Sequence, residues 1–138
     1  MKKEITMNLE DYFSKTEGTG VLATSGANGR VDAAIYGTPH IMAEGQIGFI
    51  MRPRRSLANI RLNPKAVFMY IEKDAGYTGK RIYLEKSGEE TDQKTVNLLR
   101  RSHHGGDEDK AVLVLFKVTE IRPLVGDEVV AAPAHGEI

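Results

Sequence analysis

The sequence predicts a mainly β domain, an antiparallel barrel, closed or split, of six strands with short helices between them. Six apolar runs have the length and composition of strands, tight-turn residues join most of them as hairpins, and the helical patterns between them are short. No repeat, linker or low-complexity segment interrupts the 138 residues. Residues 1–138 are therefore expected to form a single domain with one core.

The N-terminal part predicts a helix followed by a hairpin. Asn8 is expected to cap a short helix over residues 9–13, whose apolar side chains share one face. The run at 20–25, GVLATS, predicts a buried strand. The pair Asn28-Gly29 follows it, and Asn-Gly is the strongest local signal for a hairpin turn.

The next two apolar runs predict a continuation of the hairpin. Residues 31–43 are expected to return beside the first strand, with a bend at Pro39, because proline has no N–H to donate to a neighbouring strand. Residues 47–52 predict a third strand after a tight turn. Short turns between three consecutive strands indicate an antiparallel meander.

The second half predicts three more strands and two helices. The strands are expected at 65–72, 80–86 and 111–125, and the helices at 56–62 and 89–102. The first of these helices ends at Asn63, because the residue before Pro64 is pushed out of the helical region. Residues 126–138 have a weak pattern and are expected to be a mobile tail.

Composition excludes several classes of protein. The absence of cysteine excludes disulfides, zinc–cysteine sites, iron–sulfur clusters and thiol nucleophiles. Nineteen basic and nineteen acidic residues balance, which argues against a nucleic-acid-binding protein. No apolar run is long enough to span a membrane, and the N-terminus lacks the apolar core of a secretion signal. A cytoplasmic protein is expected.

Positive charge is concentrated where a strand gives way to a helix. No acidic residue occurs between Glu44 and Glu72, and the basic residues inside this window are Arg52, Arg54, Arg55, Arg61 and Lys65. Helix N-terminal N–H groups are unpaired and favour anions. Arg55 and Ser56 lie at the helix start, so their side chains and the backbone N–H groups can converge on a phosphate.

A solvated surface is the alternative interpretation of the same arginines. Runs of charge usually face solvent and balance acidic residues elsewhere. However, cations at a helix N-terminus are unfavourable unless an anion accompanies them. This conflict favours the phosphate site.

The order of motifs resembles the FMN-binding split-barrel family related to pyridoxamine 5′-phosphate oxidase. The matching features are a Leu-Ala-Thr strand at 22–24, an Asn-Gly-Arg turn at 28–30, a Ser-Leu-Ala-Asn-Ile helix start at 56–60 and an Asn-Pro-Lys-Ala-Val segment at 63–67. The match extends in register over roughly residues 8 to 125. The resemblance makes the expected barrel a six-stranded antiparallel split barrel of the FMN-binding type.

The resemblance implies a homodimer that binds one FMN per subunit at the subunit interface. It places the phosphate on Arg55 and Ser56, with Arg54 or Asn59 assisting. The residues that it places along the isoalloxazine ring are Ala34, Ile35, Tyr36, Met51 and Arg52. Small residues on the second strand are compatible with a flat ring close to the backbone, although plain strand packing explains them equally well.

The chain also departs from the family pattern. Val31 stands where many relatives have proline after the turn, and the C-terminal substrate-binding segment of the vitamin-processing oxidase has no counterpart here. Oxidation of pyridoxamine phosphate is therefore not expected. Heme or a deazaflavin remains an alternative to FMN, because one fold hosts several ligands.

Other polar residues give weaker signals. Tyr77 and Arg81 are candidates to reach the partner's flavin, or else a turn residue and a solvent-facing arginine. His40 is a candidate proton or hydrogen-bond donor near the ring, or else a histidine at the barrel rim. His103 and His104 lie beside acidic residues, but a loop fixes no ligand geometry, so no metal site is predicted.

The function expected from these residues is that of an FMN-dependent oxidoreductase, in which the protein supplies binding, orientation and electrostatics. The alternative is a non-catalytic flavin or heme carrier or sensor with the same fold. The sequence identifies neither a substrate nor an electron donor, and it assigns no catalytic residue.

Overall fold

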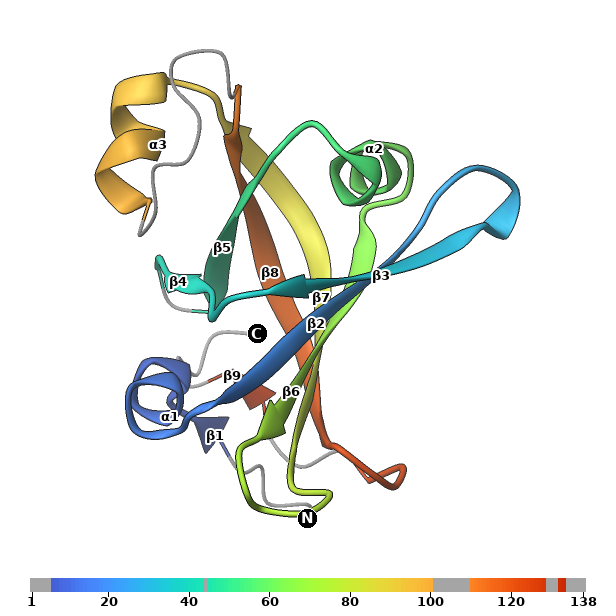
Figure 1. Cartoon of the computed structure of the whole chain (residues 1–138), viewed down its shortest axis with the longest axis vertical. Coiled ribbons are helices and arrows are strands. Elements are labelled where there is room, and N and C mark those ends of the chain that lie inside the picture. Colours follow the sequence, from blue (N-terminus) through green and yellow to red (C-terminus); the bar gives the residue numbers. More distant parts are fainter. Residues whose placement is uncertain (1–5, 44, 101–109, 129–131, 134–138) are drawn as a thin grey trace.

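The computed structural model describes residues 6–43, 45–100, 110–128 and 132–133. The strands are β1 (Thr6–Met7), β2 (Gly18–Ser25), β3 (Val31–Tyr36), β4 (His40–Ile41), β5 (Gln46–Met51), β6 (Lys65–Glu72), β7 (Gly79–Glu90), β8 (Val112–Pro123) and β9 (Ala132–Pro133). The helices are α1 (Leu9–Lys15), α2 (Arg55–Leu62) and α3 (Gln93–Leu99), with a 3₁₀ turn at Ala27–Gly29. Seven of the strands form one antiparallel sheet in the order β3-β2-β6-β7-β8-β5-β4, which curls into a half-barrel (Figure 1).

The prediction of a mainly β, antiparallel barrel with short helices is confirmed. The main sheet has seven strands instead of six. The additional strand is β4, which has two residues and pairs with β5 beyond the predicted bend at Pro39. The Asn-Gly hairpin is also present, since Asn28 and Gly29 have φ angles of 56° and 72° and β2 pairs with β3 in register.

The prediction of a three-strand meander is confirmed only in part, because the strand expected at 31–43 divides into β3, which pairs with β2, and β4, which pairs with β5. β3 pairs only with β2 and forms one edge of the sheet, whereas β5 lies near the other edge between β4 and β8. Residues 37–39 interrupt the strand and carry the chain from one edge to the other. The longer pairing of β5 is with β8, a strand more than sixty residues later, which local turn signals cannot indicate.

The predicted helix at 89–102 begins later than expected. β7 continues to Glu90, with register shifts relative to β8 after Tyr83 and after Lys86. α3 then starts at Gln93, where the Asp92 carboxylate caps the helix by accepting from the Thr95 N–H at 3.3 Å. The expected tail falls largely outside the described residues, but Ala132–Pro133 form β9, which pairs with β1.

The core lies inside the curl of the sheet. Phe68 and Phe116 are fully buried there, and Phe49 packs on both, with ring centroids 4.9 and 6.0 Å away. α1 covers one end of this core, since Phe13 meets Tyr70 edge to face at 5.1 Å. Within the described ranges no helix is long and apolar enough to cross a membrane.

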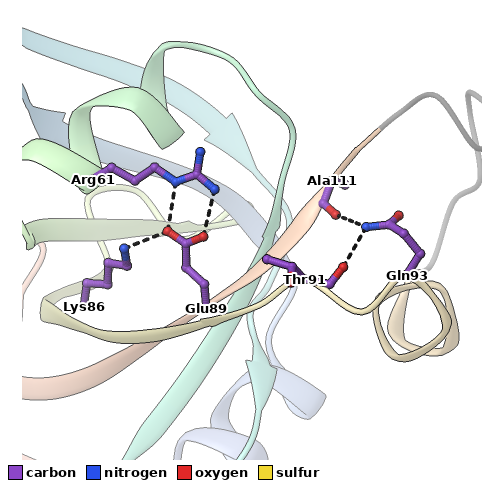
Figure 2. A network of polar contacts seen from close by, with 6 residues as sticks. All are labelled: Arg61, Lys86, Glu89, Thr91, Gln93 and Ala111. Carbon is purple, nitrogen blue, oxygen red and sulfur yellow. Dashed lines mark hydrogen bonds and ion pairs between the residues drawn. The ribbon is translucent and has the colours of Figure 1, made fainter.

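An ion-pair cluster fastens the C-terminal end of α2 to β7 (Figure 2). Arg61 donates through Nε and Nη2 to the two carboxylate oxygens of Glu89, at 2.9 and 2.8 Å, and Lys86 Nζ donates to Glu89 at 2.7 Å. The hydrogen bond from Arg61, assisted by Lys86 and opposed by burial, lowers the pKa of Glu89 from its ordinary 4.5 to about 2. This cluster holds the helix whose other end carries the arginines.

Glu89→Gln is expected to lower the free energy of unfolding by about 1 kcal/mol at neutral pH, a value limited by the exposure of Arg61. Because the pKa is lower in the folded chain, the carboxylate stabilises the fold above pH 4.5, and this contribution is lost as the pH falls towards 2. Urea titrations at pH 7 and pH 3 measure the difference in the free energy of unfolding between this variant and the wild type. Glu85→Gln, exposed on the same strand, is the control, and a difference independent of pH would contradict the prediction.

Candidate functional site

A cavity of about 500 Å³ opens between β3, the connection from β5 to α2, and the end of α3. Its volume lies in the range of small-molecule sites. Its lining residues are Asp32, Ala34, Ile35, Tyr36, Gly37, Thr38, His40, Phe49, Ile50, Arg52, Arg54, Arg55, Ser56 and Arg100. We call it the arginine cavity, because four arginines and one carboxylate line it.

The start of α2 forms one wall of the arginine cavity. Arg54 is the N-cap residue, but no side chain caps the helix, and its first turn contains no acidic residue. The orphan N–H groups and the positive end of the helix dipole therefore have no negatively charged protein group within that turn. Arg54 and Arg55 are exposed, whereas Ser56 is buried. This is an arrangement that an anion would stabilise.

Tyr36 connects β3 with the start of α2. Burial raises the pKa of the Tyr36 phenol, and a hydrogen bond with the Ser56 side chain and the charge of Arg54 oppose that rise. The ring of Tyr36 is fixed by an edge-to-face contact with Phe49, with centroids 5.7 Å apart. The Tyr36 hydroxyl is therefore neutral at neutral pH, and it is fixed beside Ser56 at the start of α2.

The carboxylate of Asp32 is the one acidic group among the described residues that line the arginine cavity. Its Oδ1 lies 3.8 Å from Nη1 of Arg55. This distance allows a weak ion pair, and Arg55 remains 70% exposed at its side chain, so it is accessible to a ligand. The guanidinium of Arg55 thus keeps much of its capacity to pair with a bound anion.

Two small residues, Ala34 on β3 and Gly37 just after it, line the cavity. Asp32, Ala34 and Tyr36 alternate along the strand and therefore share one face. A Cβ placed on Gly37 would meet no atom within 4 Å, so the space beside the strand end is open. A flat ligand can approach the backbone closely here.

Asn59 holds α2 against the β2–β3 hairpin instead of lining the cavity. Its Nδ2 donates to Oγ1 of the buried Thr24 at 3.1 Å. A Cβ on Gly26 would lie 2.1 Å from Asn59 Oδ1, so glycine is required for this close approach. Asn59 is therefore a positioning residue for the helix start.

The structure gathers most of the predicted site residues in one place. Those that line the arginine cavity are Ala34, Ile35, Tyr36, Arg52, Arg54, Arg55 and Ser56. Met51 does not, because its side chain is fully buried in the core. Tyr77 is 87% exposed in the turn between β6 and β7 and lies apart from the cavity.

Arg81 is also apart from the cavity, with its guanidinium engaged elsewhere. It lies on β7 and donates to the carbonyl oxygens of Pro123, at 2.9 Å, and Gly126, and to the Tyr83 hydroxyl at 3.3 Å. These contacts fasten the turn after β8. Within this subunit Arg81 is a structural residue, and only a partner subunit could bring it near a flavin.

Some lining residues were not predicted as cofactor contacts. Asp32 could have been found, because it alternates with Ala34 and Tyr36 along one strand. Arg100 has no local signal, since it reaches the cavity only because α3 packs through Val96. His40, weighed as a donor near the ring, also lines the cavity.

The described residues contain no cluster of three or more His, Cys, Asp or Glu side chains suited to a metal ion. His103 and His104 lie outside the described part of the chain.

Comparisons with known proteins support the fold. No family model matches the chain, and no curated protein matches its sequence. An FMN-binding protein from Syntrophomonas wolfei subsp. wolfei superposes with a TM-score of 0.68 at 20% identity, covering 84% of this chain and 83% of that one. HupZ of group A Streptococcus also gives 0.68, at 16% identity, covering 90% and 95%.

Two further solved structures are similar. A pyridoxamine 5′-phosphate oxidase-like protein from Lactobacillus delbrueckii superposes with a TM-score of 0.64 at 14% identity, covering 88% of this chain and 97% of that one. An F420 reductase gives 0.59 at 18% identity, covering 81% and 94%. The chain therefore has the fold that the resemblance to the pyridoxamine 5′-phosphate oxidase-like split barrels implied.

Proposed function

We propose that the protein is an FMN-binding flavoprotein that acts as an oxidoreductase. The observation that carries this proposal is the arginine cavity, in which an uncapped helix start with Arg54, Arg55 and Ser56 adjoins Ala34 on β3 and the open space beside Gly37. One end of the cavity suits a phosphate, and the other suits a flat ring. FMN has this combination of groups.

Each wall of the cavity has a role towards the bound cofactor. Arg55, with Arg54, would pair with the phosphate, the N–H groups of α2 would donate to its oxygens, and Ser56 and Tyr36 would add hydroxyl donors. Ala34 would let the ring approach β3. Bound FMN supplies hydride or electron transfer, and the positive charge of Arg52 would stabilise the anionic reduced form.

The comparisons support the same cofactor class. One similar structure is that of an FMN-binding protein, and others are those of a pyridoxamine 5′-phosphate oxidase-like protein and an F420 reductase. With identities of 20% or less, this likeness is one of fold. The cofactor assignment therefore depends mainly on the residues of the cavity.

The proposed assembly is a homodimer that uses the outer face of β3, β2 and β6. β3 is an edge strand, and Val31 and Ile35 on it are 80% and 71% exposed. Cross-strand pairing places apolar residues of β2 and β6 on the same face. This outer apolar face comprises Val21, Ala23, Val31, Ala33, Ile35, Val67 and Met69. An exposed apolar face on an edge strand is typical of an association surface.

Ala33→Glu is expected to convert the dimer to a monomer, because it places a charge in the middle of the outer apolar face. Sedimentation velocity at micromolar concentration measures the change, and circular dichroism shows whether the fold is kept. Thr119→Glu, an exposed position on β8, is the control. A wild-type protein that sediments as a monomer would contradict the proposed dimer.

A non-catalytic carrier is the second candidate function. It is favoured by one observation, which is that His40 lines the arginine cavity, since imidazole is a common ligand of heme iron. A heme carrier would use this histidine and the same open volume.

Absorption spectra separate these possibilities. The purified protein, titrated with FMN, is expected to show the bands and quenched fluorescence of a bound flavin. A colourless protein that leaves FMN fluorescence unchanged would contradict the proposal, and a Soret band would replace flavin with heme. Anaerobic mixing with reduced nicotinamides then tests catalysis, because a carrier would leave the flavin oxidised.

A further inference from the structure

A second cavity adjoins the arginine cavity. It has a volume of about 650 Å³ and lies between α1 and the segment that contains β4. Its lining includes Glu10, Phe13, Thr38, His40, Met42 and Leu99. In Figure 1, β4 lies between α1 and α3, which agrees with this lining. We call it the α1–β4 cavity.

The two cavities meet at the connection from β3 to β4. Thr38 and His40 line both of them. A ligand in the α1–β4 cavity would therefore lie beside whatever occupies the ring end of the arginine cavity. A smaller hollow of about 230 Å³ continues along α1 and shares Glu10 and Met42 with the α1–β4 cavity.

The two cavities differ sharply in charge. Among the described residues, four arginines line the first cavity, whereas no lysine or arginine lines the second. The one carboxylate of the α1–β4 cavity is Glu10, in the first turn of α1. The other walls combine apolar side chains, among them Phe13, Ile41 and Met42, with polar ones such as Gln46. An anion placed here would lose hydration and face Glu10, and among the described lining residues only His40 could offer it a positive charge.

We propose that the α1–β4 cavity is the substrate subsite of the flavin site and that it binds an uncharged or cationic ring-sized molecule. The inference rests on the proposed function, because the subsite matters for catalysis only if a flavin lies next to it. The volume is that of a small-molecule site, and the apolar side chains of its walls provide the driving force for binding.

Binding of a matched pair of probes tests the charge preference. Menadione is uncharged, and 1,4-naphthoquinone-2-sulfonate has the same ring system with one negative charge. Isothermal titration of the oxidised protein, with and without FMN, is expected to give binding of menadione that is at least tenfold tighter than that of the sulfonate. Equal affinities, or tighter binding of the sulfonate, would overturn the proposed preference.

Variants test whether the two probes bind in the α1–β4 cavity. Met42→Arg puts a cation into the cavity and is expected to weaken menadione binding at least fivefold, whereas Val125→Arg, exposed and in neither cavity, leaves it unchanged. Glu10→Lys reverses the charge of the one acidic wall and is expected to tighten sulfonate binding about threefold. Unchanged binding in both cavity variants would overturn the location.

The affinity for FMN, measured separately on each variant, distinguishes this inference from the proposed function. Normal FMN binding by a protein that binds neither probe overturns the subsite alone. Probe binding that responds to Met42→Arg in a chain that binds no FMN overturns the proposed function and keeps the cavity as a ligand site.

Discussion

Arg55→Ala is expected to weaken FMN binding by about 2 kcal/mol, which is roughly a thirtyfold increase in Kd, and to leave riboflavin binding nearly unchanged. Riboflavin has the same ring system but no phosphate. The loss of one charge-assisted hydrogen bond at the start of α2 should therefore affect only the phosphorylated ligand. The structure favours a clear effect, because Arg55 is exposed and only weakly paired, with Asp32 at 3.8 Å.

Quenching of flavin fluorescence measures both dissociation constants on the same preparations. Arg30→Ala is the matched control, since Arg30 is an exposed arginine of the β2–β3 hairpin that does not line the cavity. The decisive quantity is the ratio of FMN affinity to riboflavin affinity, which should fall in Arg55→Ala and stay constant in Arg30→Ala. An equal loss for both ligands would assign Arg55 to the ring or to the fold and not to the phosphate.

The parts of the cavity that the sequence revealed are those built from local patterns. The acid-free window pointed to Arg54, Arg55 and Ser56 because a helix start and its flanking charges are adjacent in the chain. Ala34 and Tyr36 followed from their place on the strand that the family resemblance assigned to the ring. Each of these residues can be placed from one predicted element and the segment next to it in the sequence.

The parts that the sequence did not reveal depend on packing between distant segments. Asn59 lies within the predicted helix start, yet its amide faces Thr24, thirty-five positions earlier, and not the cavity. Arg81 is held by carbonyl groups that follow β8, forty-two positions later in the case of Pro123. Such partners are set by the register of the sheet, which hydrophobic periodicity alone does not determine.

The incomplete prediction of the meander has the same cause. Short turns predicted one continuous strand at 31–43 between β2 and β5, but only its last part, β4, pairs with β5, while β3 remains at an edge and β5 also pairs with β8. The interruption at residues 37–39 separates the two strands and places Thr38 and His40 where the two cavities meet. The feature that local reasoning read as a bend is thus the connection on which the proposed site depends.

Gly26→Ala is expected to lower the free energy of unfolding by about 2 kcal/mol and to weaken FMN binding several-fold. The added Cβ would lie 2.1 Å from Asn59 Oδ1, so Asn59 must turn away and lose its hydrogen bond to the buried Thr24. That bond holds the start of α2 against the hairpin. Its loss would leave a buried hydroxyl without this partner and would shift the helix that carries Arg55 and Ser56.

Urea titration and FMN titration measure the two effects of this change. Gly88→Ala is the control, because a Cβ there would make only an ordinary contact, 3.9 Å from a Leu115 methyl group. The double variant Gly26→Ala/Asn59→Ala tests whether the loss of stability comes from the clash with Asn59, since removal of the Asn59 amide relieves that clash. Gly26→Ala should therefore destabilise the Asn59→Ala background much less than the wild type. Additive losses would mean that Gly26 acts through the hairpin backbone and not through the positioning of α2.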